Sequence, residues 1–135
     1  MVTLTVPAKT ENTNQLMEFL EQQLEDSGCP YAFVMQLELV VEEIFVNIAT
    51  HAYTAAGGMA TMDCDVEKDK RQIRLRFTDS GIPFNPLTKK DPDISLSAEE
   101  REIGGLGIYL VKKTMDKCEY MYENGKNVFT VTKKY

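Results

Sequence analysis

Apolar and polar residues alternate along several short segments of the chain, and this period of two is typical of β-strands with one buried face. Segment 3–6 alternates first, and segments 59–68 and 71–79 follow as a pair that meets at a charged turn. Segment 118–134 contains a second pair, whose Asn-Gly step at 124–125 is typical of a tight hairpin turn. The pattern therefore predicts one strand and two hairpins.

The segments between these strands follow the helical period instead. A cap at Asn12 or Thr13 and a stop at Gly28 bound the first predicted helix, whose leucines fall four positions apart. A second helix is expected over 30–53, and apolar residues surround it almost completely, so it should be the most buried helix. A third, short amphipathic helix is expected over 106–116.

The order of these elements, β-α-α-β-β-loop-α-β-β, predicts the fold class. Strands outnumber helices and come in hairpins, so the sheet should be mainly antiparallel with the helices on one face. We therefore predict an α+β, two-layer sandwich that forms a single domain over residues 1–135. The irregular segment 80–105 contains three prolines, and loops of this length inside a compact domain are often functional lids.

The composition agrees with a globular domain and narrows the class of partner. The 135 residues are 43% hydrophobic and 27% charged, as in ordinary soluble domains. A net charge of −6 disfavours nucleic acid or an anionic membrane as the main partner, because both need a basic surface. No apolar run approaches the roughly 20 residues of a membrane span, and the first residues lack the features of a signal peptide. We expect a cytoplasmic protein.

The three cysteines, Cys29, Cys64 and Cys118, offer no disulfide framework and no metal site. They are far apart, none belongs to a CxxC pair, and the chain has one histidine to complete a metal site. Reduced and mostly buried thiols are therefore expected.

A polar stripe interrupts the apolar second helix. Glu43, Asn47 and His51 fall four positions apart, so they stack on one helical face. Burying polar groups without partners costs roughly 1–3 kcal/mol each. This face therefore meets either solvent or a polar ligand, and a histidine at a helix end is itself common as a surface or capping residue.

Two glycine-containing segments favour the ligand. Asp79 ends a predicted strand, and Gly81 then allows close approach to the backbone, although Asp-Ser-Gly also suits an ordinary turn. Segment 104–111 opens the third helix with three glycines, and exposed amides at a helix start can hold phosphate. Each segment alone is a weak signal.

Together and in this order, the segments resemble the motifs of the GHKL (histidine-kinase-like) ATPase superfamily. Residues 42–53 (EEIFVNIATHAY) resemble its N box, residues 79–86 (DSGIPFNP) its first glycine box and residues 104–116 (GGLGIYLVKKTMD) its second. Within the superfamily the chain is similar to small bacterial serine/threonine kinases that act as anti-sigma factors. The last box departs from the family's Gly-Thr pair, because Lys126 and Asn127 follow the final glycine.

The resemblance implies the ATPase (Bergerat) fold and a binding site for ATP. Asp79 would accept a hydrogen bond from the adenine amino group. An ionised carboxylate has only hydrogen-bond acceptors, so it favours adenine over guanine, which has a carbonyl at that position. Gly81 would keep the wall close to the base. Asn127 would replace a family threonine near the base.

The resemblance also assigns residues to Mg²⁺ and the phosphates. Asn47 would bind Mg²⁺ through its amide oxygen, and Glu43 would orient or deprotonate the nucleophile that attacks the γ-phosphate. Segment 85–103 would be the ATP lid. The amides that face the phosphates would be those of Gly105, Leu106, Gly107 and Ile108.

The implied partners are an anti-sigma-factor antagonist that carries the substrate serine, and a sigma factor. A homodimer is expected, with the first strand and helix as contact surfaces, and no direct contact with nucleic acid or membrane. A non-catalytic ATP-binding regulatory module of the same fold is the alternative. The catalytic domain of a sensor histidine kinase is disfavoured because no helical hairpin carries an acceptor histidine, and a two-layer domain with another task also stays open.

Overall fold

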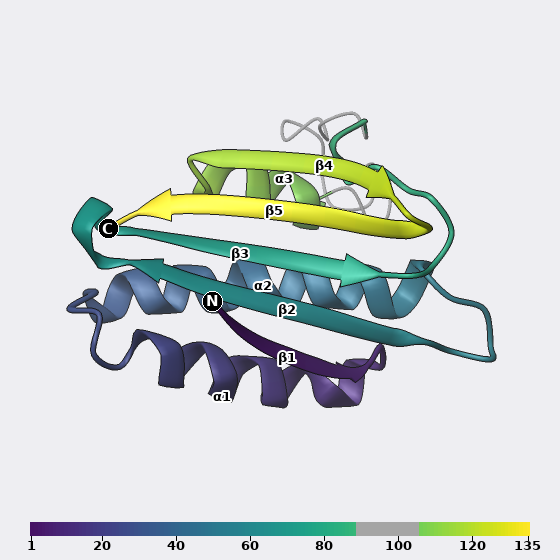
Figure 1. Ribbon diagram of the computed structural model, residues 1–135, viewed down its shortest axis with the longest axis horizontal. Coiled ribbons are helices and arrows are strands. Elements are labelled where there is room, and N and C mark those ends of the chain that lie inside the picture. Colours follow the sequence, from purple (N-terminus) through teal and green to yellow (C-terminus); the bar gives the residue numbers. More distant parts are fainter. Residues whose placement is uncertain (89–105) are drawn as a thin grey trace.

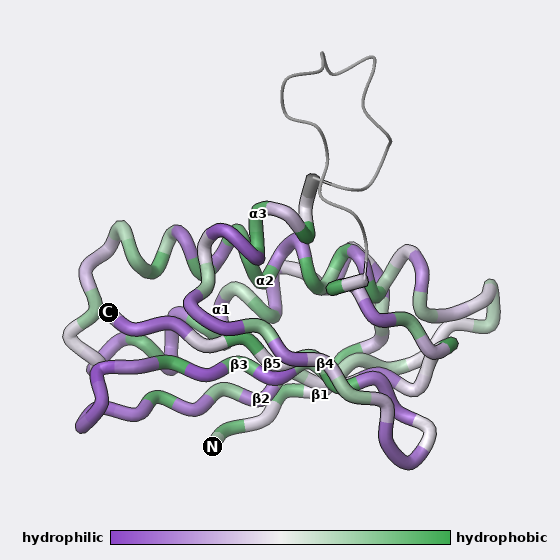
Figure 2. The backbone as a smooth tube through the Cα atoms, turned by 90° about the horizontal axis from the view of Figure 1, so that it is seen from above, coloured by the Kyte–Doolittle hydropathy of each residue, from purple (hydrophilic) through white to green (hydrophobic). Residues whose placement is uncertain are grey.

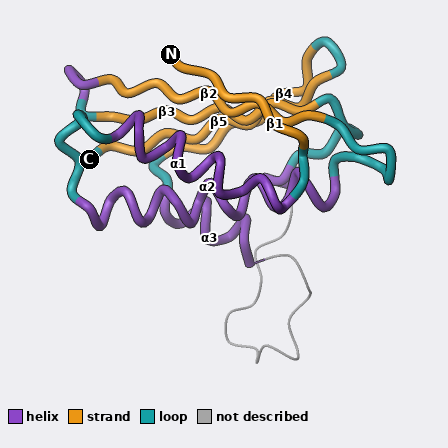
Figure 3. The backbone as a smooth tube through the Cα atoms, turned by 90° about the horizontal axis from the view of Figure 1, so that it is seen from below, coloured by secondary structure: helices purple, strands orange, loops and turns teal. Residues whose placement is uncertain are grey.

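The computed structural model describes residues 1–88 and 106–135 (Figure 1). Its five strands form one antiparallel sheet in the order β1-β2-β3-β5-β4. The strands are β1 (Val2–Pro7), β2 (Met59–Glu67), β3 (Gln72–Asp79), β4 (Lys117–Glu123) and β5 (Lys126–Lys134). The α-helices in the described residues lie on one face of this sheet (Figure 3) and are α1 (Thr13–Leu24), α2 (Tyr31–His51) and α3 (Leu106–Thr114). The predicted two-layer α+β sandwich is confirmed.

The core lies between the helices and the sheet. Helix α2 contributes the most to it among the described helices, as its apolar sequence predicts, with Val40, Val41 and Phe45 fully buried. Strand β3 buries every second residue, and Figure 2 shows hydrophobic and hydrophilic residues alternating along the strands. The buried face of the sheet therefore faces α2, and the candidate site lies at one end of this contact.

The other face of the sheet is polar, and no described helix covers it (Figure 3). Asp63 is nevertheless only 7% exposed there. It accepts a hydrogen bond from the Thr3 hydroxyl at 2.5 Å and pairs with Arg76 at 2.9 Å. A buried carboxylate without partners would be costly, and these two neighbours offset that cost.

Element ends differ from prediction where local hydrogen bonds compete. Helix α1 begins at Thr13, but Asn12 does not cap it, because its side-chain oxygen accepts from the Gln15 side chain instead. Helix α2 ends at His51, two residues before the predicted end. The β4–β5 turn is as expected: both of its central residues have positive φ, as an Asn-Gly hairpin turn requires.

All three cysteines are free thiols, as predicted. Cys64 is 2% exposed, and burial raises the pKa of its thiol to about 12. The Cys118 thiol is half-buried, and burial raises its pKa as well. Both thiols are therefore protonated and unreactive near neutral pH.

Candidate functional site

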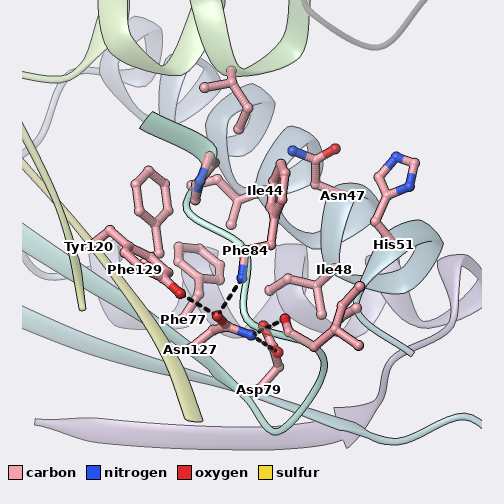
Figure 4. A pocket seen from close by; sticks show the side chains of 14 residues that line it. Ile44, Asn47, Ile48, His51, Phe77, Asp79, Phe84, Tyr120, Asn127 and Phe129 are labelled. Carbon is pink, nitrogen blue, oxygen red and sulfur yellow. Dashed lines mark hydrogen bonds between the residues drawn. The ribbon is translucent and has the colours of Figure 1, made fainter. Parts of the chain in front are cut away.

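A narrow hollow opens between α2, α3 and one end of the sheet (Figure 4). Its open space, including the part that merges with solvent, is about 500 Å³. Apolar side chains form most of the wall, among them Ile44, Ile48, Phe77, Ile82, Phe84, Ile108 and Phe129. The polar groups that line it are Asn47, His51, Asp79, Tyr120 and Asn127. A mostly apolar hollow with a few polar groups is the usual setting for a small-molecule ligand.

Asp79 faces the hollow because the alternation that buries Phe77 continues to the end of β3. Its Oδ1 accepts hydrogen bonds from the Gly81 N–H and from Asn127 Nδ2, each at 2.9 Å. Its Oδ2 has no hydrogen-bond partner among the described residues. Every fully buried side-chain oxygen or nitrogen in the described residues does have such a partner, so Oδ2 is not fully buried. Oδ2 is therefore accessible and can accept a hydrogen bond from a ligand.

Gly81 brings the segment after β3 against the end of α2. The Ile82 N–H donates to the Ala52 carbonyl at 3.0 Å, and a Cβ on Gly81 would collide with that same carbonyl. The collision involves backbone on both sides, so no side chain can move to relieve it. Glycine is required here by close approach.

Gly81→Ala is therefore expected to lower the free energy of unfolding by about 1–3 kcal/mol, because the added methyl group forces two backbone segments apart. Urea denaturation followed by circular dichroism measures the change. Ser80→Ala is the matched control, since Ser80 is exposed and only its backbone N–H forms a described hydrogen bond. Equal unfolding free energies for the two variants would contradict this close packing.

The polar stripe of α2 divides between two environments. Asn47 and His51 line the hollow, and Figure 4 shows them apart from the pair formed by Asp79 and Asn127. The Glu43 carboxylate lies instead against the first turn of α3, where a Cβ on Gly107 would collide with its Oε2. The stripe therefore meets a cavity and a glycine helix start rather than open solvent alone.

The remaining predicted residues are placed only in part. Ile108, in the first turn of α3, is 3% exposed and lines the hollow, and α3 itself begins at Leu106. Gly105 and residues 89–103 of the predicted lid lie outside the described residues. The first lid residues are described, and Pro86–Thr88 form a 3₁₀ turn.

Two tyrosines that the sequence pattern did not single out form hydrogen bonds around the site. The Tyr53 hydroxyl accepts from the Ser80 N–H at 2.7 Å and donates to the Met59 carbonyl at 2.6 Å, so it ties the end of β3 to the start of β2. The Tyr120 hydroxyl donates to Asn127 Oδ1 at 2.5 Å. The alternation of β4 places Tyr120 on the side of the sheet that faces the helices. Its hydrogen bond to Asn127 depends on β4 lying next to β5 in the sheet.

The family model of the histidine kinase-like ATPase domain matches residues 6–133. The chain belongs to this family. The chain is similar to the serine-protein kinase RsbW of Listeria monocytogenes serovar 1/2a. The two are 30% identical over 132 residues, which cover 94% of this chain and 83% of the relative. The serine/threonine-protein kinase BtrW of Bordetella bronchiseptica is 28% identical, over 71% of this chain and 67% of the relative.

Solved structures of the ATPase family share the fold. The RsbU and RsbW domains of Rv1364c from Mycobacterium tuberculosis align with a TM-score of 0.64 at 14% identity, over 99% of this chain and 32% of that one. The histidine kinase domain of a blue-light activated kinase from Erythrobacter litoralis gives 0.54 at 14% identity, over 94% and 60%. The predicted family, fold and protein serine/threonine kinase class are confirmed. No described helix has the length and apolar character needed to cross a membrane.

Proposed function

We propose that this chain is a Mg-ATP-dependent serine/threonine kinase that phosphorylates a small anti-sigma-factor antagonist and acts as an anti-sigma factor. The observation that carries the proposal is the hollow itself, which is lined by an apolar wall, by the Asn47 amide and by the Asp79 carboxylate, whose Oδ2 has no partner among the described residues. Relatives named serine-protein kinase and serine/threonine-protein kinase support the transfer step.

Adenine fits the end of the hollow beside Asp79. Its flat ring suits the apolar wall, and its exocyclic amino group can donate to the accessible Oδ2. A guanine ring presents a carbonyl at that position, so two hydrogen-bond acceptors would face each other without a donor. Asp79 would therefore select the base, and Gly81 would hold the adjoining wall close to it.

Mg²⁺ and the phosphates fit the side of the hollow formed by α2 and α3. Asn47 is half-buried, and its amide has no hydrogen-bond partner among the described residues, so its oxygen is available as a Mg²⁺ ligand. Mg²⁺, when bound, neutralises charge on the phosphate oxygens. Gly107 has no side chain, so the Glu43 carboxylate can lie close against the first turn of α3. The backbone amides of this turn, including those of Leu106 and Ile108, would face the phosphates. Gly105 belongs to the same proposed phosphate contact.

Glu43 would act on the nucleophile. Its carboxylate lies beside Gly107 at the start of α3, one helical turn from Asn47, and it has no hydrogen-bond partner among the described residues. A half-buried, unpaired carboxylate beside the phosphate contacts can accept the proton of an incoming serine hydroxyl. Glu43 would therefore orient or deprotonate the acceptor serine.

The partners follow from the similarity to the small kinases and extend the proposal. The acceptor would be a serine of the antagonist, and a sigma factor would bind the same protein in the cytoplasm. We also propose a homodimer through β1 and α1, a choice supported by the position of β1 at an edge of the sheet. A monomer mass in light scattering at micromolar concentration would remove the dimer from the proposal.

Transfer from radiolabelled ATP to a candidate antagonist tests the function. We expect Mg²⁺-dependent labelling of one serine, lost when that serine is replaced by alanine. Binding of ATP without any labelling would instead indicate the non-catalytic regulatory module. No binding at millimolar nucleotide would contradict both.

A further inference from the structure

The Asn127 side chain has a complete set of protein partners. Its Nδ2 donates to Asp79 Oδ1 and to the Ile82 carbonyl, each at 2.9 Å. Its Oδ1 accepts from the Phe84 N–H at 3.1 Å and from the Tyr120 hydroxyl at 2.5 Å. Asn127 is 6% exposed, so these contacts form in a largely water-free place. The amide has no group left to bind a base directly.

These partners fix the direction of the amide. The Phe84 N–H can only donate, and the Ile82 carbonyl can only accept. A flipped amide would place its N–H groups against the Phe84 N–H and its oxygen against the Ile82 carbonyl and Asp79. Only one orientation satisfies all four contacts, so Nδ2 must face Asp79.

Tyr120 contributes the shorter of the two bonds that hold Asn127 Oδ1. Its half-buried side chain points from β4 toward the same end of the hollow (Figure 4). Burial, the largest cause, raises the pKa of its phenol, and the negative charge of Asp79 raises it further, although the Phe84 backbone opposes this. The hydroxyl therefore keeps its proton at neutral pH and stays a donor.

We propose that Tyr120 and Asn127 are positioning residues for base selection. Asn127 holds Oδ1 of Asp79 and thereby aims Oδ2 at the ligand, and Tyr120 holds Asn127 in the orientation that does so. The pair replaces the Gly-Thr feature that the family resemblance leads one to expect at this turn. The inference rests on the proposed ATP site and adds a cause for its preference for adenine.

The readout is the ratio of the Kd values for inosine triphosphate and ATP, because inosine carries a carbonyl where adenine carries its amino group. A residue needed only for stability would weaken both nucleotides alike. A residue that aims Oδ2 changes the ratio, since Oδ2 contacts that one position of the base. Isothermal titration calorimetry with Mg²⁺ measures both values.

Asn127→Asp keeps the shape but places a carboxylate oxygen against Asp79 and the Ile82 carbonyl. Either the Asp79 carboxylate rotates away, or the two acids share a proton. In both cases Oδ2 of Asp79 no longer points at the ligand as a charged acceptor. We expect the ratio to fall by at least about tenfold. Asn124→Asp is the matched control, because Asn124 is exposed in the β4–β5 turn, and aspartate also tolerates positive φ there while adding the same charge. Its ratio should stay within about twofold.

Tyr120→Phe removes one hydrogen bond and keeps the ring, so it is informative even if the aspartate variant does not fold. We expect the ratio to fall roughly three- to tenfold. Tyr122→Phe on the same strand should leave it unchanged, since the Tyr122 hydroxyl has no partner among the described residues. An unchanged ratio in Tyr120→Phe, with tight ATP binding by the unsubstituted protein, would overturn this inference alone. Absence of ATP binding by the unsubstituted protein would overturn the proposed function as well.

Discussion

Replacing Asp79 with asparagine is expected to raise the Kd for Mg-ATP about 10- to 100-fold, because a hydrogen bond to a charged group contributes roughly 1.5–3 kcal/mol. The Gly81 N–H would still bond to the oxygen of the new amide. The amide nitrogen would then take the place of Oδ2 and present hydrogens to the adenine amino group. Two donors would face each other, and calorimetric titration would show the loss.

The same substitution should improve the relative binding of inosine triphosphate, whose carbonyl can accept from the new amide. Asp63→Asn is the matched control, because Asp63 is equally buried but lies on the opposite face of the sheet, beside Arg76. It should cost stability without changing the Kd for ATP. Equal effects of the two substitutions on nucleotide binding would contradict the assignment of Asp79.

Glu43→Gln is expected to leave the Kd for Mg-ATP within about threefold and to reduce phosphotransfer by roughly 10²- to 10⁴-fold, the usual contribution of a general base. Glutamine keeps the volume of the side chain beside Gly107 but cannot accept a proton. The rate of serine labelling under saturating ATP measures the loss, and titration measures binding separately.

Glu42→Gln is the control for that experiment. Glu42 is the adjacent carboxylate, but it is exposed and lies beside a shallow groove between α1 and α2, away from α3. Its substitution should change neither binding nor transfer. A Glu43 variant that folds normally yet loses ATP binding together with transfer would contradict a role in proton transfer.

The fold could be predicted because each element carries its own periodic signal. Helix α2 is apolar on nearly every side and is buried, and the Asn124-Gly125 step forms the turn its residues favour. The element ends were predicted less accurately, because local side-chain hydrogen bonds and contacts with other segments both act there. Helix α2 ends at His51, and the Tyr53 hydroxyl then accepts a hydrogen bond from the Ser80 N–H, a contact that no local pattern predicts.

The site was predictable where one helix or one strand end determines it. Asn47 and His51 share a helical face and line the hollow together, and Asp79 follows from the alternation of β3. The role of Asn127 was not predictable in the same way. Its amide joins β3, β4 and the segment after β3, and that meeting requires the β3-β5-β4 strand order. The ATP-binding roles of all these residues stay predictions.

Titration of the ¹⁵N-labelled protein with Mg-ATP tests most directly whether a nucleotide occupies the hollow. We predict saturable changes in the backbone amide signals of Gly81, Phe84 and Gly107, with little change at Thr3 and Arg76 on the far face of the sheet. Changes confined to that far face, or none at millimolar ATP, would contradict the binding of ATP between α2 and the end of β3.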